Sequence, residues 1–570
     1  MAIEALANFV LNISSEHIIV FDFAVIIIVS TLFAIVARAL KQPLIPAYVV
    51  AGLIIGPLVL GLITNIEILK SFSEIGIAFL LFATGIEISF KKIKEAGISK
   101  ILFVGIVQIT LIVLIIILLR NFLFLSLLQA TYLGAIIAFS STMVVVKTLS
   151  DRGELSTLHG RLVLGILLLE DLVAVLAIIF FTTGTFSIVA VLIAFLKLGA
   201  LVVFALFLHY FILNKLFRFA ASSPEFLFLT SLSLLFLFVL FSFLTNISVT
   251  IGAFIAGVLI ANSPFKTELE SRINPLRDFF AIVFFVVIGT QIVFSGVSVK
   301  LLIIILLSAF ILKPVISVVL FRIMGYRQRT SFLTAISLAH ISEFSLIIVL
   351  IGFSMSVITQ GLLSTIILSI IISMSTASYF INYKNGIYNI LEKPLRILKF
   401  LPIKEDLEYK SSGDKKILLV GAHRIGSIIL QKLMKRKQEL VVIDYNPEII
   451  IALIKKKISS IYGELKSHET LKKVELKKLK LIISTIPNFE ENLYLLEKVK
   501  EVNSAAVVIL TASRISETKE LYEKGADYVI APKMLAGDEL IDLLRTGKKG
   551  IAKAKKEHLK RMKNIHNLLY

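Results

Sequence analysis

The sequence predicts a polytopic α-helical membrane protein of about 13 spans, followed by a C-terminal α/β domain with a Rossmann-like fold. Hydrophobic residues make up 57% of the 570 residues, too many for an ordinary soluble chain of this length. Apolar runs of about 20 residues, enough to cross a bilayer, recur as far as residue 382. Residues 1–404 contain 27 Lys and Arg with 17 Asp and Glu, against 32 with 22 in the much shorter 405–570. We therefore expect the chain to pass from the bilayer into water near residue 404.

The membrane part is predicted to cross the bilayer roughly thirteen times. The spans are placed near residues 17–39, 43–63, 72–90, 98–120, 127–148, 161–183, 186–213, 224–244, 248–263, 276–297, 299–322, 330–353 and 357–382. Basic residues gather in alternate loops, for example Lys91, Lys92 and Lys94, and the positive-inside rule puts these loops in the cytoplasm. We therefore expect a multi-pass protein of the cell (inner or plasma) membrane, with its N-terminus outside and its C-terminal domain in the cytoplasm.

The sixth predicted span contains the stretch VLGILLLEDLVAVLA, in which Glu170 and Asp171 interrupt an apolar run. Carboxylates at this depth are costly and indicate a functional site. Adjacent helical residues point about 100° apart, so the two acids face different neighbours. A buried carboxylate can bind a cation or a proton, but hardly both, because either one neutralises the charge that attracts the other. Competition for Asp171 would therefore couple two ion fluxes.

Two other predicted spans carry polar interruptions, IIAFSSTMVV (136–145) and SLAHISEFSLII (337–348). Packing between helices is the simpler explanation of such hydroxyl runs. Two runs in oppositely oriented helices are, however, typical of inverted-repeat transporters, which build a midplane site from two broken helices. The predicted cation ligands are Asp171, Glu170, Ser141 and Thr142. The predicted crossing residues are Ser140, His340 and Glu343, which can neutralise half-helix ends.

Lys313, in SAFILKPVISVV, is a further charge at mid-membrane depth. It is the predicted neighbour of Glu170. If the two form a permanent ion pair, only Asp171 exchanges charge, and one cation moves for one proton. If Lys313 instead releases its proton, transport becomes electrogenic. Both interpretations stay open at this point.

The region after residue 414 alternates short apolar strands with helical patterns, which predicts a parallel doubly wound sheet. The strands are predicted at 415–421, 439–444, 479–486, 505–510 and 526–531. The turn GAHRIG provides Gly421 and Gly426 of a dinucleotide fingerprint, and Asp444 provides its ribose-binding acid. His423 replaces the middle glycine, and its Cβ should obstruct a pyrophosphate. AMP is therefore at least as plausible a ligand as NAD(H), and a sheet that has lost its ligand is the alternative.

These motifs resemble the monovalent cation:proton antiporters of the second cation/proton antiporter superfamily, especially the Kef-type potassium efflux systems. The resemblance is carried by SST (140–142), by DRGELSTLHGRLVLGILLLEDLVA (151–174) and by AHISEF (339–344). The C-terminal part resembles the RCK, or TrkA-N, domain through ILLVGAHRIG, VVIDYNP and IYGE (Ile461 to Glu464). The resemblance implies a homodimer and a nucleotide-binding role for Glu464.

The acid pair departs from this resemblance. Kef-type proteins generally carry Gln-Asp there, whereas the sodium-selective electrogenic relatives carry Asp-Asp and a lysine in the position of Lys313. The Kef-like domain order favours K⁺, and an acid at position 170 favours Na⁺. We expect K⁺/H⁺ exchange slightly ahead of Na⁺/H⁺ exchange, with no tightly bound metal.

The resemblance divides the chain into an antiporter domain (1–384), a linker (385–414), an RCK/TrkA-N regulatory domain (415–544) and a basic tail (545–570). The segment 545–563 holds nine basic residues and one acid, so it is either a solvated helix or a contact with anionic lipid. Nucleic-acid binding is not predicted, because no aromatic residues interleave these bases. A ligand-gated potassium channel is a rival prediction, although no TVGYG-like filter occurs. No catalytic pair is recognisable, so an enzyme is not predicted.

Overall fold

The computed structural model describes residues 18–569, apart from 64, 88–97, 153, 156, 183–187, 246–247, 262, 396, 399–407, 410–413, 464, 466–469 and 472. The chain divides into two compact units. The first comprises Met1–Leu155 and His159–Ile403, and the second comprises Ser156–Leu158 and Lys404–Tyr570.

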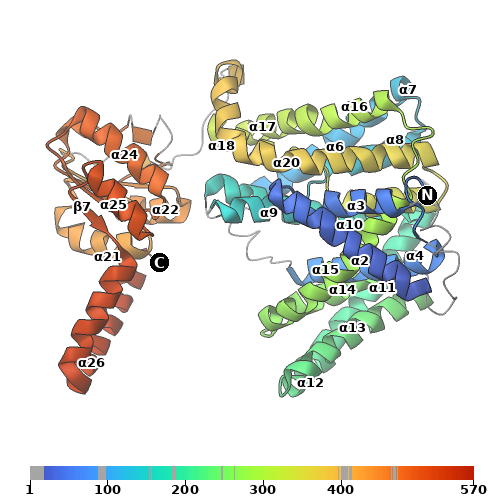
Figure 1. Ribbon diagram of the computed structural model, residues 1–570, viewed down its shortest axis with the longest axis horizontal. Coiled ribbons are helices and arrows are strands. Elements are labelled where there is room, and N and C mark those ends of the chain that lie inside the picture. Colours follow the sequence, from blue (N-terminus) through green and yellow to red (C-terminus); the bar gives the residue numbers. More distant parts are fainter. Residues whose placement is uncertain are drawn as a thin grey trace, which may run out of the picture. The chain divides into compact units, whose positions relative to one another are not determined.

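The first unit is helical (Figure 1). Its elements are α2 (Ile18–Ala39), α3 (Leu44–Ile55), α4 (Ile66–Glu87), α6 (Ile98–Leu118), α7 (Arg120–Leu123), α8 (Leu127–Ala138), α9 (Thr142–Asp151), α10 (Leu158–Phe181), α11 (Ile188–Leu208), η1 (His209–Leu213), α12 (Asn214–Ala220), α13 (Pro224–Leu244), α14 (Val249–Ala261), α15 (Lys266–Thr290), α16 (Val299–Leu307), η2 (Ser308–Leu312), α17 (Lys313–Ile323), α18 (Gln328–Ser337), α19 (Phe344–Ser354) and α20 (Gln360–Leu395). Within the described residues, nine helical segments are long and apolar enough to cross a membrane.

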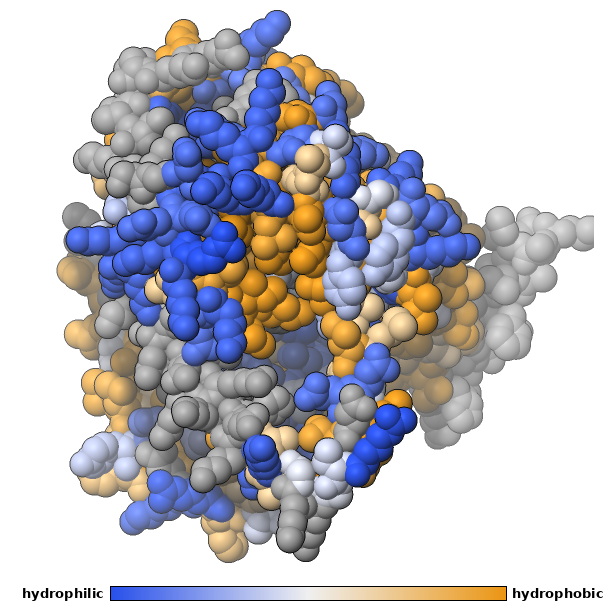
Figure 2. Space-filling view, turned by 90° about the vertical axis from the view of Figure 1, so that its left-hand side faces the viewer, coloured by the Kyte–Doolittle hydropathy of each residue, from blue (hydrophilic) through white to orange (hydrophobic). Residues whose placement is uncertain are grey.

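The outer surface of these helices is apolar, as a lipid-facing surface must be. On α2, for example, Ile28, Leu32 and Ile35 are exposed. The side of the α/β unit that faces the viewer in Figure 2 is, by contrast, largely hydrophilic around an apolar area. The multi-span helical fold predicted from the apolar runs is thus confirmed.

Helices α3 and α15 approach closely through glycine. A Cβ on Gly52 would lie 2.0 Å from the carbonyl oxygen of Val286, and a Cβ on Gly289 would lie 2.1 Å from that of Val49. Small residues let helix backbones approach in this way, which stabilises packing where no hydrophobic effect acts between helices. A larger side chain at Gly52 or Gly289 would therefore push α3 and α15 apart.

The second unit is a seven-stranded sheet of order β1-β4-β3-β2-β5-β6-β7, in which only β1 is antiparallel. The strands are β1 (Glu408–Tyr409), β2 (Ile417–Val420), β3 (Leu440–Asp444), β4 (Ser459–Tyr462), β5 (Leu481–Ser484), β6 (Val507–Thr511) and β7 (Tyr528–Ile530). The helices are α21 (Arg424–Leu433), η4 (Met434–Arg436), α22 (Pro447–Lys455), η5 (Leu476–Lys478), α24 (Phe489–Val502), α25 (Ile515–Glu523) and α26 (Pro532–Leu569). The predicted Rossmann-like sheet is confirmed.

Alternation along the strands gives the sheet two buried faces. Ile417 and Leu419 of β2 pack in one core with Leu430 of α21, while Leu418 packs in the other with Leu495 of α24. Helices α21 and α22 therefore cover one face, and α24 and α25 the other. The strand order reverses between β2 and β5, so the crevice at their carboxyl ends is the ordinary place for a ligand.

Three local features of the second unit, at β4, β1 and α26, were not predicted from the sequence. Strand β4 was not predicted, because SSIY lacks the apolar composition of its neighbours. Strand β1 lies in the stretch predicted as a linker and pairs with β4 at the sheet edge. Helix α26 crosses the predicted start of the tail at residue 545, with a kink at Gly547, whose φ is 65°.

Candidate functional site

Two interrupted helices form the centre of the site. Helix α8 ends at Ala138 and α9 begins at Thr142, with extended backbone at Phe139 and Ser141. Ser141 is the N-cap of α9, and its hydroxyl accepts a hydrogen bond from the N–H of Val144 at 3.5 Å. The second interruption separates α18, which ends at Ser337, from α19. Each break leaves backbone N–H and C=O groups that need partners inside the protein.

The two breaks supply partners to each other. Three hydrogen bonds join them: Ser140 Oγ to the carbonyl of Leu338 (3.2 Å), the N–H of Ser342 to the carbonyl of Phe139 (3.0 Å), and the N–H of Ser141 to Nε2 of His340 (3.0 Å). All of these groups belong to residues that are fully or almost fully buried. The broken segments therefore cross and contact each other, and polar side chains replace the missing helical hydrogen bonds.

Lys313, the first residue of α17, is fully buried beside the crossing. Its ammonium donates to the carbonyl of His340 at 3.1 Å and to that of Ile137 at 3.4 Å. One carbonyl comes from each interrupted helix. Within the described residues, no carboxylate lies at ion-pair distance from this ammonium. Lys313 thus places a positive charge beside a buried carbonyl at each helix break.

The two acids of α10 have different partners. Glu170 is fully buried and accepts from the N–H of Ser140 at 2.6 Å and from Nε2 of Gln108 at 3.1 Å. Asp171 is 4% exposed and accepts from the hydroxyl of Thr142 at 2.9 Å. Both acids therefore contact the first break, Glu170 at its backbone and Asp171 at the start of α9.

The predicted residues come together to different degrees. Thr142 binds Asp171 directly, whereas the hydroxyl of Ser141 caps α9. Glu343 is 2% exposed at the N-cap of α19, within electrostatic range of Asp171. Lys313 and Glu170 lie at the same crossing but hydrogen-bond to different groups.

Sequence reasoning missed Gln108 and Ser317. Gln108 binds Glu170, and the hydroxyl of Ser317 donates to Oε1 of Gln108 at 2.5 Å. A signal existed, since Gln108 is a lone amide in the apolar run of α6 and Ser317 lies one turn after Lys313. Only packing could pair residues so far apart in sequence.

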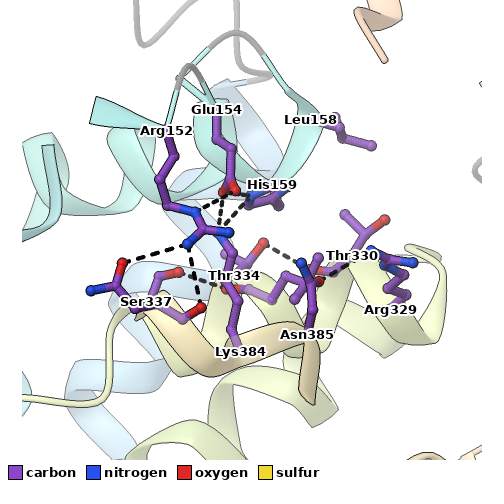
Figure 3. A network of polar contacts seen from close by, with 12 residues as sticks. Arg152, Glu154, Leu158, His159, Arg329, Thr330, Thr334, Ser337, Lys384 and Asn385 are labelled. Atoms are coloured by element: carbon purple, nitrogen blue, oxygen red, sulfur yellow. Dashed lines mark hydrogen bonds and ion pairs between the residues drawn. The ribbon is translucent and has the colours of Figure 1, made fainter. Parts of the chain in front are cut away.

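A second polar cluster lies at the N-terminal end of α10 (Figure 3). Glu154 accepts from the ammonium of Lys384 and contacts Nε2 of His159 at 3.1 Å, while Arg152 binds Glu154 at 2.8 Å. Arg152 also donates to the backbone of Asn382 on α20. Burial alone would raise the pKa of Glu154, but hydrogen bonds and charges from His159 and Lys384 outweigh burial and lower this pKa below its usual value. The cluster therefore links the end of α9 to α10 and to α20 through hydrogen bonds and ion pairs.

In the α/β unit, the glycine turn has the geometry that its fingerprint predicts. Gly421 follows β2 with φ of 80°, a conformation that favours glycine. A Cβ on Gly426 would lie 1.9 Å from the carbonyl oxygen of Gly421, so α21 begins in close contact with the turn. His423, the N-cap of α21, is exposed and gives the first helical turn no side-chain cap. The backbone N–H groups in the first turn of α21 can thus bind an anionic group.

Asp444 lies beside this turn at the end of β3. Its carboxylate accepts from the N–H of Ala422 and from that of Asn446, both at 2.7 Å. Burial raises the pKa of Asp444, although these hydrogen bonds oppose the shift. Two bonds leave further lone pairs on a carboxylate, so Asp444 can also accept a hydrogen bond from a hydroxyl group such as that of a ribose. Glu464, the other predicted nucleotide ligand, lies outside the described residues.

Comparison with known proteins now decides the family. Residues 25–381 match the transmembrane sodium/hydrogen exchanger family, and residues 417–532 match the TrkA-N domain. The chain belongs to the sodium/hydrogen exchanger family. This exchanger is therefore a multi-pass transporter-family protein with a C-terminal TrkA-N domain, not an enzyme, as predicted from the resemblance to Kef-type proteins.

The relatives of the exchanger fit this assignment. It is 26% identical to YbaL of Escherichia coli (strain K12), assigned to the cation/proton antiporters, over 91% of this chain and 96% of YbaL. It is 26% identical to the glutathione-regulated potassium-efflux system protein KefC of Klebsiella pneumoniae (strain 342), over 84% of this chain and 77% of KefC. The sodium proton antiporter MjNhaP1 of Methanocaldococcus jannaschii shares its fold, with a TM-score of 0.52, 17% identity and coverage of 65% of this chain and 98% of MjNhaP1.

Proposed function

We propose that this exchanger moves a monovalent cation against protons across the cell membrane, with K⁺ slightly favoured over Na⁺. The observation that carries the proposal is the crossing of two broken helices with a buried acid, Asp171, bonded to Thr142 at the start of one half-helix. This arrangement places a carboxylate, a hydroxyl and half-helix ends in one buried region, which is how inverted-repeat transporters hold ions near the bilayer midplane.

Asp171 is the shared site in this mechanism. Its carboxylate binds either a cation, together with oxygens from Thr142 and the break, or a proton. Glu343 lies close enough to Asp171 for the two carboxyl groups to interact electrostatically. Because a bound cation and a proton each neutralise Asp171, the site changes sides only when it carries one of them. Exchange follows from this competition.

Architecture and orientation belong to the same proposal. The roughly thirteen predicted spans each overlap a helix or an interrupted helix, and the broken pairs α8–α9 and α18–α19 are the counterparts in two inverted repeats. We place the N-terminus outside and the α/β unit in the cytoplasm on the basis of the basic loops. Two copies form the homodimer that the family resemblance implies.

The TrkA-N domain is proposed to regulate exchange by binding a nucleotide, AMP or NAD(H). Gly421 and the uncapped start of α21 would hold the phosphate, and Asp444 a ribose hydroxyl. The site lies at the β2/β5 reversal of the sheet, where such folds bind ligands. The nucleotide then shifts the transporter toward whichever conformation binds it more tightly.

Purified exchanger in liposomes tests the proposal. A pH jump with K⁺, Na⁺ or Li⁺ offered separately should give cation-dependent proton movement, fastest with K⁺. Faster movement with Na⁺ would identify a Na⁺/H⁺ antiporter. Cation flux without any proton movement would instead favour the rival assignment as a ligand-gated channel and would reject exchange.

A further inference from the structure

Gln108 is a buried amide that the exchange mechanism above does not use. It is fully buried in α6, a helix that is otherwise almost entirely apolar. Burying an amide costs free energy unless its polar atoms are hydrogen-bonded. Both ends of this amide are bonded, one to Glu170 and the other to Ser317. The Gln108 side chain therefore belongs to a hydrogen-bonded series of three side chains, with Glu170 on one side and Ser317 on the other, and does not merely fill space.

The direction of the hydrogen bonds from Ser317 through Gln108 to Glu170 matches an ionised Glu170. The NH₂ group of Gln108 faces Oε1 of Glu170, and Oε1 of Gln108 faces the hydroxyl of Ser317, whose single proton is shared between this oxygen and the carbonyl of Lys313. The other carboxylate oxygen of Glu170 accepts from the N–H of Ser140. Both oxygens thus accept from N–H donors that cannot accept in return, and hydrogen bonds to a charged acceptor are stronger than neutral ones.

This hydrogen-bonded series also contacts the backbone on both sides of the crossing. Ser140 is in the first break, and the hydroxyl of Ser317 lies 2.8 Å from the carbonyl of Lys313, the residue whose ammonium binds both breaks. A Glu170 that rotated away would release the N–H of Ser140 at the break. Gln108 blocks this rotation, because it holds the opposite oxygen.

We propose that Gln108 is a positioning residue of the exchanger: oriented by Ser317, its amide holds the Glu170 carboxylate, as an anion, against the N–H of Ser140. The inference rests on the proposed exchange function and deepens it. Gln108 bonds to Glu170 and not to Asp171 or Thr142, which are proposed to bind the cation. It therefore controls how fast the crossing rearranges and not how tightly Asp171 binds the cation.

The test compares Gln108→Met, which keeps the size of the side chain but has no N–H donor, with the wild type in liposomes. We expect the maximal rate to fall about tenfold or more, as for loss of a hydrogen bond to a charged group, with the cation KM within about twofold of the wild type. Ser317→Ala should lower the rate less, by about threefold. Ser231→Ala is the control, since Ser231 is fully buried but bonds only to its own helix at the carbonyl of Phe228.

A double variant separates positioning from a general packing defect. In Glu170→Gln the carboxylate charge is gone, so adding Gln108→Met should slow exchange less than about twofold further. Effects that multiply, a wild-type rate in Gln108→Met, or a KM that rises in step with the loss of rate would each overturn the inference.

Infrared spectroscopy gives a readout that needs no transport. The carboxylate band of Glu170 is identified by its loss in Glu170→Gln, and it should shift in Gln108→Met but not in Ser231→Ala. An unshifted band would reject the role of Gln108. Absence of exchange in the wild type would reject the proposed function, and the band shift would still decide the inference.

Discussion

Nε2 of His340 accepts a hydrogen bond from the backbone N–H of Ser141 at 3.0 Å and so joins the second broken helix to the first. An imidazole nitrogen accepts only when it carries no proton, so this bond requires neutral His340 with its proton on Nδ1. Within the described residues Nδ1 has no partner, which leaves Nε2 as the functional end of the ring. This pair of residues spans 199 positions of sequence and holds the crossing together.

Removing this acceptor should weaken the crossing. In His340→Leu the buried N–H of Ser141 loses its partner, which we expect to destabilise the protein by roughly 1–3 kcal/mol. Thermal unfolding in detergent measures this change. His340→Gln, which can offer a carbonyl, should recover part of the loss, and His209→Gln, outside the crossing, should match the wild type. Equal stability of His340→Leu and the wild type would contradict the role of this bond.

Asp171→Asn should abolish exchange. An amide can neither release a proton nor balance the charge of a cation, so both alternately bound species are lost. Proton movement driven by K⁺ and by Na⁺ in liposomes measures the effect. Asp151→Asn, at the exposed end of α9, is the matched control and should exchange normally. Cation-dependent proton flux that survives in Asp171→Asn would remove Asp171 from the mechanism.

Lys313→Gln tests whether transport moves net charge. The ammonium of Lys313 is buried and bonds to carbonyls rather than to a carboxylate at ion-pair distance. We therefore expect Lys313 to release a proton when a cation binds, which makes the wild type electrogenic. One net charge moved through 100 mV is worth about 2.3 kcal/mol, so a membrane potential should change the wild-type rate strongly.

The same potential should leave Lys313→Gln unaffected, with Lys300→Gln, in the first turn of α16, as the control. A voltage response shared by Lys313→Gln and the wild type would show that Lys313 is structural.

The cluster at Glu154 predicts a stability that depends on pH. Because the folded-state pKa of Glu154 is lowered, its ion pair with Lys384 and its bond to His159 stabilise the fold fully above the ordinary carboxyl pKa. This contribution declines as the pH falls below that value and is gone below the lowered folded-state pKa. Glu154→Gln should lower the unfolding free energy at pH 7 by about 2 kcal/mol and by much less near pH 3. Thermal unfolding across this range checks the sign, and an equal loss at both pH values would contradict it.

His423 predicts which nucleotide binds the TrkA-N domain. Its Cβ occupies the middle position of the glycine turn, where a pyrophosphate would lie against the backbone. His423→Gly should raise the affinity of the full-length protein for NAD by about tenfold and change that for AMP less. His423→Ala keeps the Cβ and should show no gain. Calorimetric titration of both variants with NAD and AMP measures this, and equal gains in the two variants would show that the Cβ is not the obstacle.

The fold followed closely from the sequence, but the site did so only in part. Apolar length predicted the helices, and strand alternation predicted the strands with large aliphatic residues; β4 was missed because its serines carry no such signal. The acids and hydroxyls of the crossing were found because charge and polarity are conspicuous in apolar runs. Gln108 and the Glu154 cluster were not found, since a single amide or a lysine in a long helix is also common at packed or solvated positions.

The sequence alone indicated which segments are long and apolar enough to cross a bilayer, and that Glu170 and Asp171 point in different directions. These are properties of consecutive residues, namely their hydrophobicity and the 3.6-residue period of the helix. The partners of the two acids, in contrast, depend on the packing of helices that are distant in sequence. Glu170 bonds to Gln108, 62 residues away, and Asp171 to Thr142, 29 residues away. Such partners depend on how separate helices pack, because a buried polar group bonds to whichever donor the fold brings within reach.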